Sequence, residues 1–404
     1  MKAEIITIGD EILSGQTTDT NSAYLGEKLS QLGIEITFKT SVGDDIKNIS
    51  EAIHNALNRA DLVITTGGLG PTNDDLTKKA VVKVFKRNLI FHEEILKKIE
   101  GNFRKRGIPM PKINQNQALI PQGSKALDNQ WGTAPGILIE ERRKLFFALP
   151  GVPLEMRTIT ESGVLNILQK KTKTLFFQKR LKTTGIPESY IYEKIENLLK
   201  AKTGVKIAFL PSFLGVDIKL TSESEKRLIE VEQKIKKILE NNFYGEGDIT
   251  LEEVVGKLLL EKKKTISVAE SCTGGLIGKR FTNISGSSQW FERGVITYSN
   301  QSKTELLGVP EEFLEKHGAV SEQVAILMAE GVKRISRTDY GLSSTGIAGP
   351  TGETPEKPVG LAYIGFAHEN DSFAEKHIFG EDRNTNRERT AQAALNLVRL
   401  FLEK

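Results

Sequence analysis

One short stretch of the chain combines a hydroxyl, a thiol and paired glycines, which are residue types suited to nucleophilic catalysis. In residues 265–280, TISVAESCTGGLIGKR, a β-rich run leads to Ser271 and Cys272, and two glycines precede a segment that can form a helix. A tight turn between a strand and a helix could hold a nucleophile outward beside exposed backbone N–H groups. The alternative is that Ser271 or Thr273 only caps the helix, because Ser and Thr are preferred at helix starts.

A serine alcohol needs a base, and here a lysine is a better candidate than a histidine. The five histidines offer no compelling partner; His317, for example, reads as the last residue of a helix. Lys303 ends the run YSNQSK, which follows a strand-like segment over 294–298. Burial can lower the pKa of a lysine far enough for it to act as a general base. The alternative is a surface lysine at the start of a helix over 303–307.

Strand-like runs in the last third of the chain repeatedly end in polar loops. Besides the run before Ser271 and the one before Lys303, the run 341–345 leads into GIAGPTG, and 360–367 is a further strand. If the first three are neighbours in one sheet, their loops converge on one pocket. A helix predicted over 251–262 precedes them.

Glycines and carboxylates recur in two loops near the N-terminus. The first loop begins with Gly-Asp-Glu at 9–11, and the second, GGLGPTNDD, covers 67–75. Three glycines in four positions would expose N–H groups to an anion, and carboxylates suit a divalent cation that bridges to phosphate oxygens. The alternative is a capping box with Thr72 as N-cap, which would account for one of the two aspartates. The pattern is neither a Walker loop nor G-x-G-x-x-G, so a kinase or dehydrogenase is unsupported.

The elements that must position the N-terminal loops alternate regularly. Strand-like runs at 3–8, 34–40 and 61–66 are separated by helical patterns at 21–32 and 46–58. This alternation predicts a doubly wound α/β domain with a parallel sheet, and ligands bind such sheets at the carboxyl ends of their strands.

The middle of the chain predicts a small α+β domain. A strand within 175–186, a helix over 187–200, two short strands and a charged helix over 223–240 follow one another. Glutamates are interleaved with the lysines of the last helix, and no G-x-x-G loop occurs between Gly185 and Gly247. We therefore expect a spacer or dimerisation module and no nucleic-acid partner.

Length and composition favour a multidomain globular protein. The 404 residues predict two or three domains, and 38% hydrophobic and 27% charged residues are typical of soluble proteins. A net charge of +4 gives no general case for nucleic-acid binding. A single cysteine excludes an internal disulfide, the N-terminus is not a signal peptide, and no run approaches the ~20 apolar residues of a membrane span. We expect a cytoplasmic protein with no membrane contact.

Several motifs in a fixed order carry a resemblance to a known family. GDEILSG, GGLGPTNDD, N-x-x-GTAPG and LPGVPLEM in the first part, and AESCTGG, YSNQSK, STGIAGPTG and EKPVG in the last, resemble the CinA family (competence/damage-inducible protein A). The resemblance implies three domains: a molybdopterin-binding-like doubly wound α/β domain over 1–170, a small KH-like α+β domain over 171–249 and an α/β CinA C-terminal domain over 250–404.

For the C-terminal domain the resemblance implies nicotinamide-nucleotide amidase activity, which converts nicotinamide mononucleotide to nicotinic acid mononucleotide and ammonia without a cofactor. Ser271 would attack the carboxamide, Lys303 would act as base, and Tyr298 would assist proton transfer, with Thr345 also in the catalytic group. The implied substrate-binding residues are Cys272, Thr273, Gly274, Gly275, Gly346, Thr351, Arg383 and Arg387.

For the N-terminal domain the resemblance implies an ADP-ribose pyrophosphatase that depends on a divalent metal such as Mg²⁺. The implied metal or phosphate-site residues are Asp10, Glu11, Asp74 and Asp75. The implied nucleotide-binding residues are Gly67, Gly68, Gly70, Asn73, Thr133 and Gly136.

Three alternatives stay open at this point. Cys272 is a rival nucleophile, because a cysteine beside a helix start can have a lowered pKa. Glu353 replaces a glycine that is frequent in the family and could clash with a substrate phosphate or point outward. A non-catalytic nucleotide- or partner-binding protein linked to competence or DNA damage is the second function class. We expect a homodimer by default.

Overall fold

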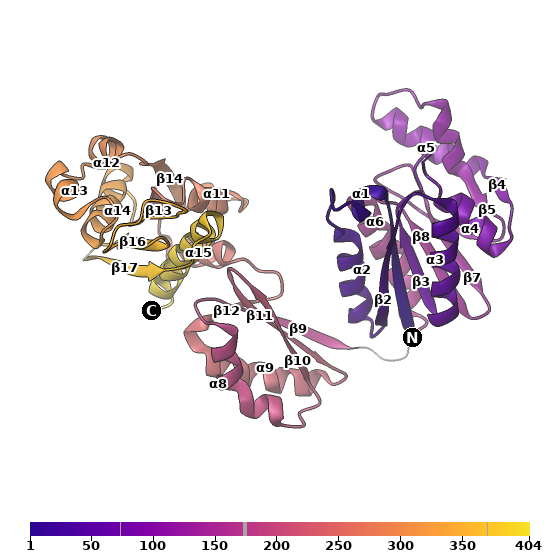
Figure 1. Ribbon diagram of the computed structural model, residues 1–404, viewed down its shortest axis with the longest axis horizontal. Coiled ribbons are helices and arrows are strands. Elements are labelled where there is room, and N and C mark those ends of the chain that lie inside the picture. Colours follow the sequence, from indigo (N-terminus) through magenta and orange to yellow (C-terminus); the bar gives the residue numbers. More distant parts are fainter. Residues whose placement is uncertain (73, 173–175, 370) are drawn as a thin grey trace. The chain divides into compact units, whose positions relative to one another are not determined.

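The chain folds into two compact units, each with its own hydrophobic cores. The computed structural model describes residues 1–72, 74–172, 176–369 and 371–404. The units are Met1–Phe177 and Gln178–Lys404, and most of their helices and strands are labelled in Figure 1. Within the described ranges, no helix combines the length and apolar character that a bilayer span requires.

The first unit alternates strands and helices, as the sequence pattern predicts. In chain order its elements are β1 (Lys2–Ile8), α1 (Asp10–Leu13), α2 (Thr20–Gln31), β2 (Glu35–Val42), α3 (Ile46–Arg59), β3 (Leu62–Thr66), α4 (Thr77–Phe85), β4 (Leu89–Phe91), α5 (Glu93–Lys105), η1 (Lys112–Ala118), β5 (Leu119–Pro121), β6 (Lys125–Leu127), β7 (Gly136–Glu141), β8 (Lys144–Leu149), α6 (Pro153–Ile159), η2 (Thr160–Val164) and α7 (Leu165–Gln169).

A six-stranded sheet in the order β2-β1-β3-β8-β7-β6 forms the centre of this unit. Its first four strands are parallel, whereas β7 and β6 run antiparallel to their neighbours, so the sheet is mixed rather than fully parallel. Successive side chains of a strand point to opposite faces. Ile5 accordingly packs in one core with Leu25 of α2, and Ile6 packs in the other with Ile53 of α3. Helices therefore cover both faces, as Figure 1 shows for α2 and α3.

The second unit begins with a four-stranded sheet and two helices and continues into a larger α/β region. The first part contains β9 (Phe177–Thr183), α8 (Glu188–Lys200), β10 (Lys206–Ser212), β11 (Gly215–Ser222), α9 (Glu225–Leu239), η3 (Glu240–Asn242) and β12 (Phe243–Glu246). The second part contains α10 (Leu251–Lys262), β13 (Ile266–Glu270), α11 (Leu276–Thr282), η4 (Ser287–Gln289), β14 (Phe291–Ile296), α12 (Asn300–Leu307), α13 (Glu311–His317), α14 (Glu322–Ser336), β15 (Tyr340–Gly346), β16 (Leu361–Ala367), β17 (Ser372–Ile378) and α15 (Arg383–Leu402).

The larger sheet of the second unit brings three polar loops to one edge. Its order is β14-β13-β15-β16-β17, and β13 pairs in parallel with both β14 and β15. The loops after these three strands therefore leave the same edge of the sheet. This confirms that the three strands are neighbours, which was the condition for their loops to form one pocket.

The two parts of the second unit are joined by buried polar contacts. Arg399 of α15, which is 1% exposed, donates to the carbonyl oxygen of Phe243 at 3.3 Å and also to that of Asn241. Gln392 Nε2 of the same helix donates to Thr184 Oγ1 at 3.2 Å. The four-stranded part is therefore packed against the region that carries Ser271.

Candidate functional site

Ser271 lies at the carboxyl end of β13, where its hydroxyl meets a buried lysine. The backbone N–H of Ser271 donates to the carbonyl oxygen of Ser344 at 2.9 Å, which fixes the start of the turn against β15. Lys303 reaches in from α12, and its Nζ lies 3.2 Å from Ser271 Oγ. Ser271 is 8% exposed and Lys303 only 1% exposed. The alternative of a surface lysine is therefore wrong, because the side chain points into the domain.

The surroundings of Lys303 favour its neutral form. Burial lowers the pKa of Lys303 from its ordinary 10.5 to about 8. Its Nζ donates to the carbonyl oxygens of Thr297 at 2.8 Å and Tyr298 at 3.3 Å, and the carbonyl oxygen of Ser299 is a third, longer contact at 3.5 Å. A neutral amine has two N–H donors and one lone pair. With both donors held by carbonyls, the lone pair is free to accept the proton of the Ser271 hydroxyl.

The helix start beyond Ser271 is capped by Glu270. Its carboxylate accepts from the N–H groups of Gly275 at 2.9 Å, Ile277 at 3.1 Å and Gly278 at 2.8 Å. A carboxylate suits this place because the N–H groups and the helix dipole both favour negative charge. Thr273 instead shares a hydrogen bond of 2.7 Å with Ser344 Oγ. The expectation that Ser271 or Thr273 caps this helix is wrong, and both hydroxyls are spared for other contacts.

The turn leaves two backbone donors without an acceptor oxygen. Gly274 N–H donates to the carbonyl oxygen of Ser271 at 3.2 Å, and Gly275 N–H is taken by Glu270. The backbone N–H groups of Cys272 and Thr273 have no acceptor oxygen in the described part of the chain, and both contact the Cys272 sulfur, which is a weak acceptor. These two N–H groups directly follow Ser271 and are the donors that an oxyanion could use.

The thiol of Cys272 is unsuited to attack. The residue is buried, and burial raises the pKa of its thiol to about 12. The reactive species of cysteine is the thiolate, which is scarce at neutral pH when the pKa is so high. Between the two neighbouring candidates, the geometry favours Ser271.

Two arginines from the first turn of α15 reach the loops around Ser271. Arg387 Nη2 donates to the carbonyl oxygen of Thr273 at 2.8 Å. Arg383 Nη1 donates to the carbonyl oxygen of Gly349 at 2.8 Å, and its Nη2 donates to the phenol oxygen of Tyr298 at 3.1 Å. The Tyr298 side chain is exposed and contacts Arg383, while its carbonyl helps to hold Lys303. The proton-transfer role expected for the phenol has no contact with Ser271 or Lys303 among the described hydrogen bonds.

The other residues expected at this site have less direct positions relative to Ser271 and Lys303. Thr345 is buried, and its hydroxyl donates to the carbonyl oxygen of Ala319 at 2.7 Å, so this donor is not free for catalysis. Gly346 ends β15, where an added Cβ would lie 2.7 Å from the carbonyl oxygen of Leu361. Thr351 and Glu353 are exposed on the following loop.

A second candidate site is a cavity of about 440 Å³ at the carboxyl ends of β1, β3 and β8. Gly67 and Gly68 form its wall with positive φ of 115° and 64°. A Cβ at Gly67 would lie 2.1 Å from the carbonyl oxygen of Ile8, so only glycine fits there. The cavity is lined by Ile8, Gly9, Glu11, Asp44, Gly67, Gly68, Leu69, Gly70, Pro71, Asp74, Asp75, Gln117, Thr133, Ala134, Pro150, Gly151, Val152 and Glu155.

Some of the expected N-terminal residues serve the fold instead. Asp10 is not among the lining residues, and its Oδ1 accepts from the backbone N–H of Asp44 at 3.1 Å. Gly136 begins β7 and is packed in the core. Asp75 lines the cavity but accepts from the N–H groups of Gly70 at 2.7 Å and Thr72 at 2.8 Å. The expected Thr72 N-cap is wrong, because α4 begins at Thr77 with Leu76 as N-cap.

The carboxylates do not converge on one point. Across the described ranges, no group of three or more His, Cys, Asp or Glu side chains is arranged to hold a metal ion. The residues therefore do not fit a preformed metal site, and we derive no step through a metal. The expected nucleotide contact Asn73 lies outside the described residues.

The sequence interpretation missed several polar residues of the two sites. Asp44 lines the N-terminal cavity, and burial together with the nearby charges of Asp10, Glu11 and Asp75 raises the pKa of its carboxyl group. Lys78 is buried, which lowers its pKa to about 8, and it donates to the carbonyl oxygen of Asn116 at 2.5 Å. In the other site Glu270 was missed. It directly precedes Ser271, so its position was a usable signal.

Three segments of the chain match known domain families. Residues 4–170 match a probable molybdopterin binding domain, residues 178–245 match the KH domain of damage-inducible protein CinA, and residues 248–402 match the CinA C-terminal domain. These matches confirm the expected fold of three α/β-type domains.

Relatives match over the full chain. A protein of Caldicellulosiruptor bescii, named as a competence-damage inducible protein, is 46% identical over 405 residues, covering 99% of this chain and 98% of that one. A CinA-like protein of Dictyoglomus thermophilum is 44% identical over 406 residues, with coverage of 99% and 98%. The solved structure of a CinA protein from Thermoplasma acidophilum, described as of unknown function, is 35% identical and covers 41% of this chain and 97% of its own, with a TM-score of 0.39.

The capping arrangement predicts a clear order of stability effects. Glu270→Gln should lower the free energy of unfolding by about 1–2 kcal/mol, because a neutral amide offers one acceptor oxygen to three N–H donors. Ser271→Ala should lower it by less, about 0.5–1 kcal/mol, because one buried hydrogen bond, to Lys303 Nζ, is lost. Urea unfolding can be followed through Trp290, which is buried in the core of the second unit, in a Trp131→Phe background. The opposite order would mean that Ser271 is the cap.

Proposed function

This chain belongs to the CinA family of competence/damage-inducible proteins, and we propose that its C-terminal domain is a nicotinamide-nucleotide amidase. The observation that carries this proposal is the buried Lys303 amine 3.2 Å from Ser271 Oγ. A buried serine–lysine pair at the edge of a sheet suits acyl transfer through a covalent intermediate. The family resemblance supplies nicotinamide mononucleotide as the substrate.

The proposed reaction begins with attack of Ser271 Oγ on the carboxamide carbon while its proton moves to the neutral Lys303 amine. The oxyanion that forms accepts from the N–H groups of Cys272 and Thr273, an effect of roughly 3–4 kcal/mol per donor. The C–N bond then breaks, and the Lys303 ammonium returns the proton to the departing ammonia. Water attacks the ester with Lys303 again as base, which releases nicotinic acid mononucleotide and restores Ser271.

Substrate binding is assigned to the two arginines of α15. Each guanidinium has five N–H donors, and the contacts of Arg383 and Arg387 with the loops use only some of them. Arg383 is exposed and could therefore turn remaining donors toward a phosphate. Placing the phosphate here would orient the pyridine ring toward the Ser271 turn.

The nucleophile assignment predicts a specific pattern of variant activities. Wild-type protein incubated with nicotinamide mononucleotide should release ammonia. Ser271→Ala and Lys303→Ala should each lower kcat/KM by about 10³-fold or more, because each removes one half of a cooperating pair. Cys272→Ala keeps the backbone N–H and should retain activity within about tenfold. Binding without ammonia release by the wild type would favour the non-catalytic alternative. If Cys272→Ala lost activity and Ser271→Ala kept it, Cys272 would be the nucleophile.

The base assignment predicts the pH dependence. Lys303 must be neutral to accept the serine proton, so kcat/KM should rise with pH and level off above about 8, the pKa set by burial. The lowered pKa raises the neutral fraction at pH 7 by about two orders of magnitude over an ordinary lysine. A pH profile of ammonia release in buffers of constant ionic strength measures this. Activity that falls as pH rises through 8 would contradict a neutral base.

We propose for the N-terminal domain the second activity, hydrolysis of ADP-ribose to AMP and ribose 5-phosphate. The supporting observation is the cavity of about 440 Å³ with its glycine wall. In the described residues, the N–H groups of Gly68 and Leu69 have no acceptor, and successive free N–H groups of this kind suit a phosphate. The dependence on a divalent metal comes from the family resemblance alone.

This second proposal is tested by ADP-ribose hydrolysis with Mg²⁺ and with excess EDTA. The resemblance alone implies that hydrolysis stops in EDTA. Asp74→Asn should lower the rate at least about tenfold, because a carboxylate that lines the cavity is lost. Asp128→Asn is the matched control, since Asp128 forms an exposed ion pair with Lys98 outside this cavity. Hydrolysis indifferent to EDTA would contradict the metal dependence, and equal rates for the two variants would contradict the role of Asp74.

A further inference from the structure

An exposed tryptophan stands beside the N-terminal cavity on an unusually well-anchored loop. Trp131 is 57% exposed, although tryptophan is normally largely buried. It lies two residues before Thr133, which lines the cavity of about 440 Å³. In the part of the chain that the structure describes, its ring has no aromatic or cation partner. Its exposed apolar surface is therefore available to a ligand.

The backbone around Trp131 is held from several directions. Asn129 Oδ1 accepts from the N–H groups of Trp131 at 3.1 Å and Gly132 at 2.8 Å, and Asn129 Nδ2 donates to the carbonyl oxygen of Ala134 at 2.8 Å. Arg106 Nη2 donates to the carbonyl oxygen of Trp131 at 2.6 Å. A loop fixed in this way presents the indole with little loss of backbone entropy on binding.

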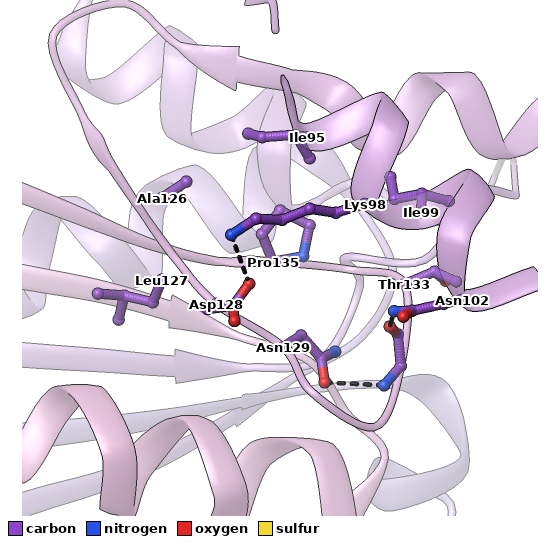
Figure 2. Close-up of a pocket in the computed structure, with 11 residues that line it drawn as sticks. Ile95, Lys98, Ile99, Asn102, Ala126, Leu127, Asp128, Asn129, Thr133 and Pro135 are labelled. Atoms are coloured by element: carbon purple, nitrogen blue, oxygen red, sulfur yellow. Dashed lines mark hydrogen bonds and ion pairs between the residues drawn. The ribbon is translucent and has the colours of Figure 1, made fainter. Parts of the chain in front are cut away.

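Side-chain hydrogen bonds hold this loop close to the cavity of about 440 Å³. Figure 2 shows Asn129 and Asn102 of α5 among the residues that line a second, smaller cavity next to the loop. Asn102 Nδ2 donates to the carbonyl oxygen of Gly132 at 2.9 Å. Asn129 Nδ2 also donates to Glu155 Oε2 at 2.6 Å, and Glu155 lines the larger cavity. The indole-bearing turn is thus tied to the cavity wall by side-chain hydrogen bonds.

Trp131 is accompanied by other exposed apolar side chains on segments that line the cavity. Val152 is itself a lining residue, and Leu13 follows Glu11 in α1; both are more than half exposed. Val152 at the cavity and Trp131 on a loop tied to its wall put apolar side chains next to polar groups. Apolar surface next to a polar cavity suits a nucleotide, which joins phosphates to a flat aromatic base.

We infer that the indole of Trp131 is the stacking surface for the base of a nucleotide whose phosphate groups occupy the glycine-walled cavity. This inference rests on the nucleotide function proposed above for the N-terminal domain. The glycine N–H groups bind phosphate and cannot distinguish one nucleotide sugar phosphate from another. Trp131 supplies the part of the affinity that depends on the base, because stacking on an aromatic ring acts through the π-face of the base.

The test uses AMP and ribose 5-phosphate, which differ by adenine and are not turned over by the proposed hydrolysis. Binding to the full chain is measured by calorimetry in the presence of Mg²⁺. AMP should bind more tightly than ribose 5-phosphate, and Trp131→Ala should weaken AMP binding roughly 5- to 100-fold, the range that base stacking contributes. Ribose 5-phosphate binding should not change. Trp131→Phe keeps an aromatic face and should restore most of the AMP affinity.

Fluorescence locates the contact. The chain has two tryptophans, and Trp290 is 1% exposed in the core of the second unit. AMP should quench the wild-type emission and leave the emission of Trp131→Phe unchanged, since only Trp290 then emits. This separates binding at the N-terminal cavity from any binding of AMP near Ser271.

Each other outcome overturns the inference in a recognisable way. Equal AMP and ribose 5-phosphate affinities with no effect of Trp131→Ala would remove the base contact and leave the phosphate cavity intact. If neither compound binds, the proposed N-terminal function fails and the inference fails with it. If Trp131→Ala changes the sedimentation of the protein and not its AMP affinity, the indole belongs to a protein contact.

Discussion

The C-terminal site depends on the burial of one amine. Placing Lys303 inside the domain penalises its charged form, and its pKa falls to about 8. The carbonyl oxygens of Thr297 and Tyr298 accept its N–H groups and keep the side chain from leaving the interior. This fixes the position of the amine relative to Ser271, which the neighbouring strand β13 supplies. The parallel pairing of β14, β13 and β15 is what makes that meeting possible.

A second constraint acts within the turn after β13. Helix α11 begins there, and its free N–H groups need acceptors. Glu270 accepts three of them, so the hydroxyl of Ser271 can face Lys303 and the N–H groups of Cys272 and Thr273 are left without an acceptor oxygen in the described chain. Adjacent side chains of this turn therefore have different tasks: Glu270 caps the helix, and Ser271 faces the lysine amine. The buried thiol of Cys272 fits this division, because burial keeps it protonated.

The N-terminal cavity divides its acidic residues in a comparable way. Asp10, Asp44 and Asp75 accept from backbone N–H groups and shape the loops, whereas Glu11 and Asp74 are further carboxylates in the cavity lining. Negative charges so close together raise the pKa of Asp44, and a bound cation or a proton would relieve their repulsion. Gly68 and Leu69, whose N–H groups have no acceptor in the described chain, line the same cavity. The exposed indole of Trp131 is the complementary apolar element.

The sequence alone determined the α/β alternation and the segments that carry the chemistry, because these follow from local periodicity and from motifs contiguous in the chain. The three-domain organisation was implied by the family resemblance. The sequence left open whether the strands that precede Ser271 and Lys303 are neighbours. Only the tertiary structure decided that Lys303 is buried against Ser271, that Glu270 rather than Thr273 caps α11, and that Asp10 binds the N–H group of Asp44 and is not among the cavity-lining residues. Those outcomes depend on which side chains are buried and on which of several nearby groups each one hydrogen-bonds. The periodicity of the sequence does not predict that choice.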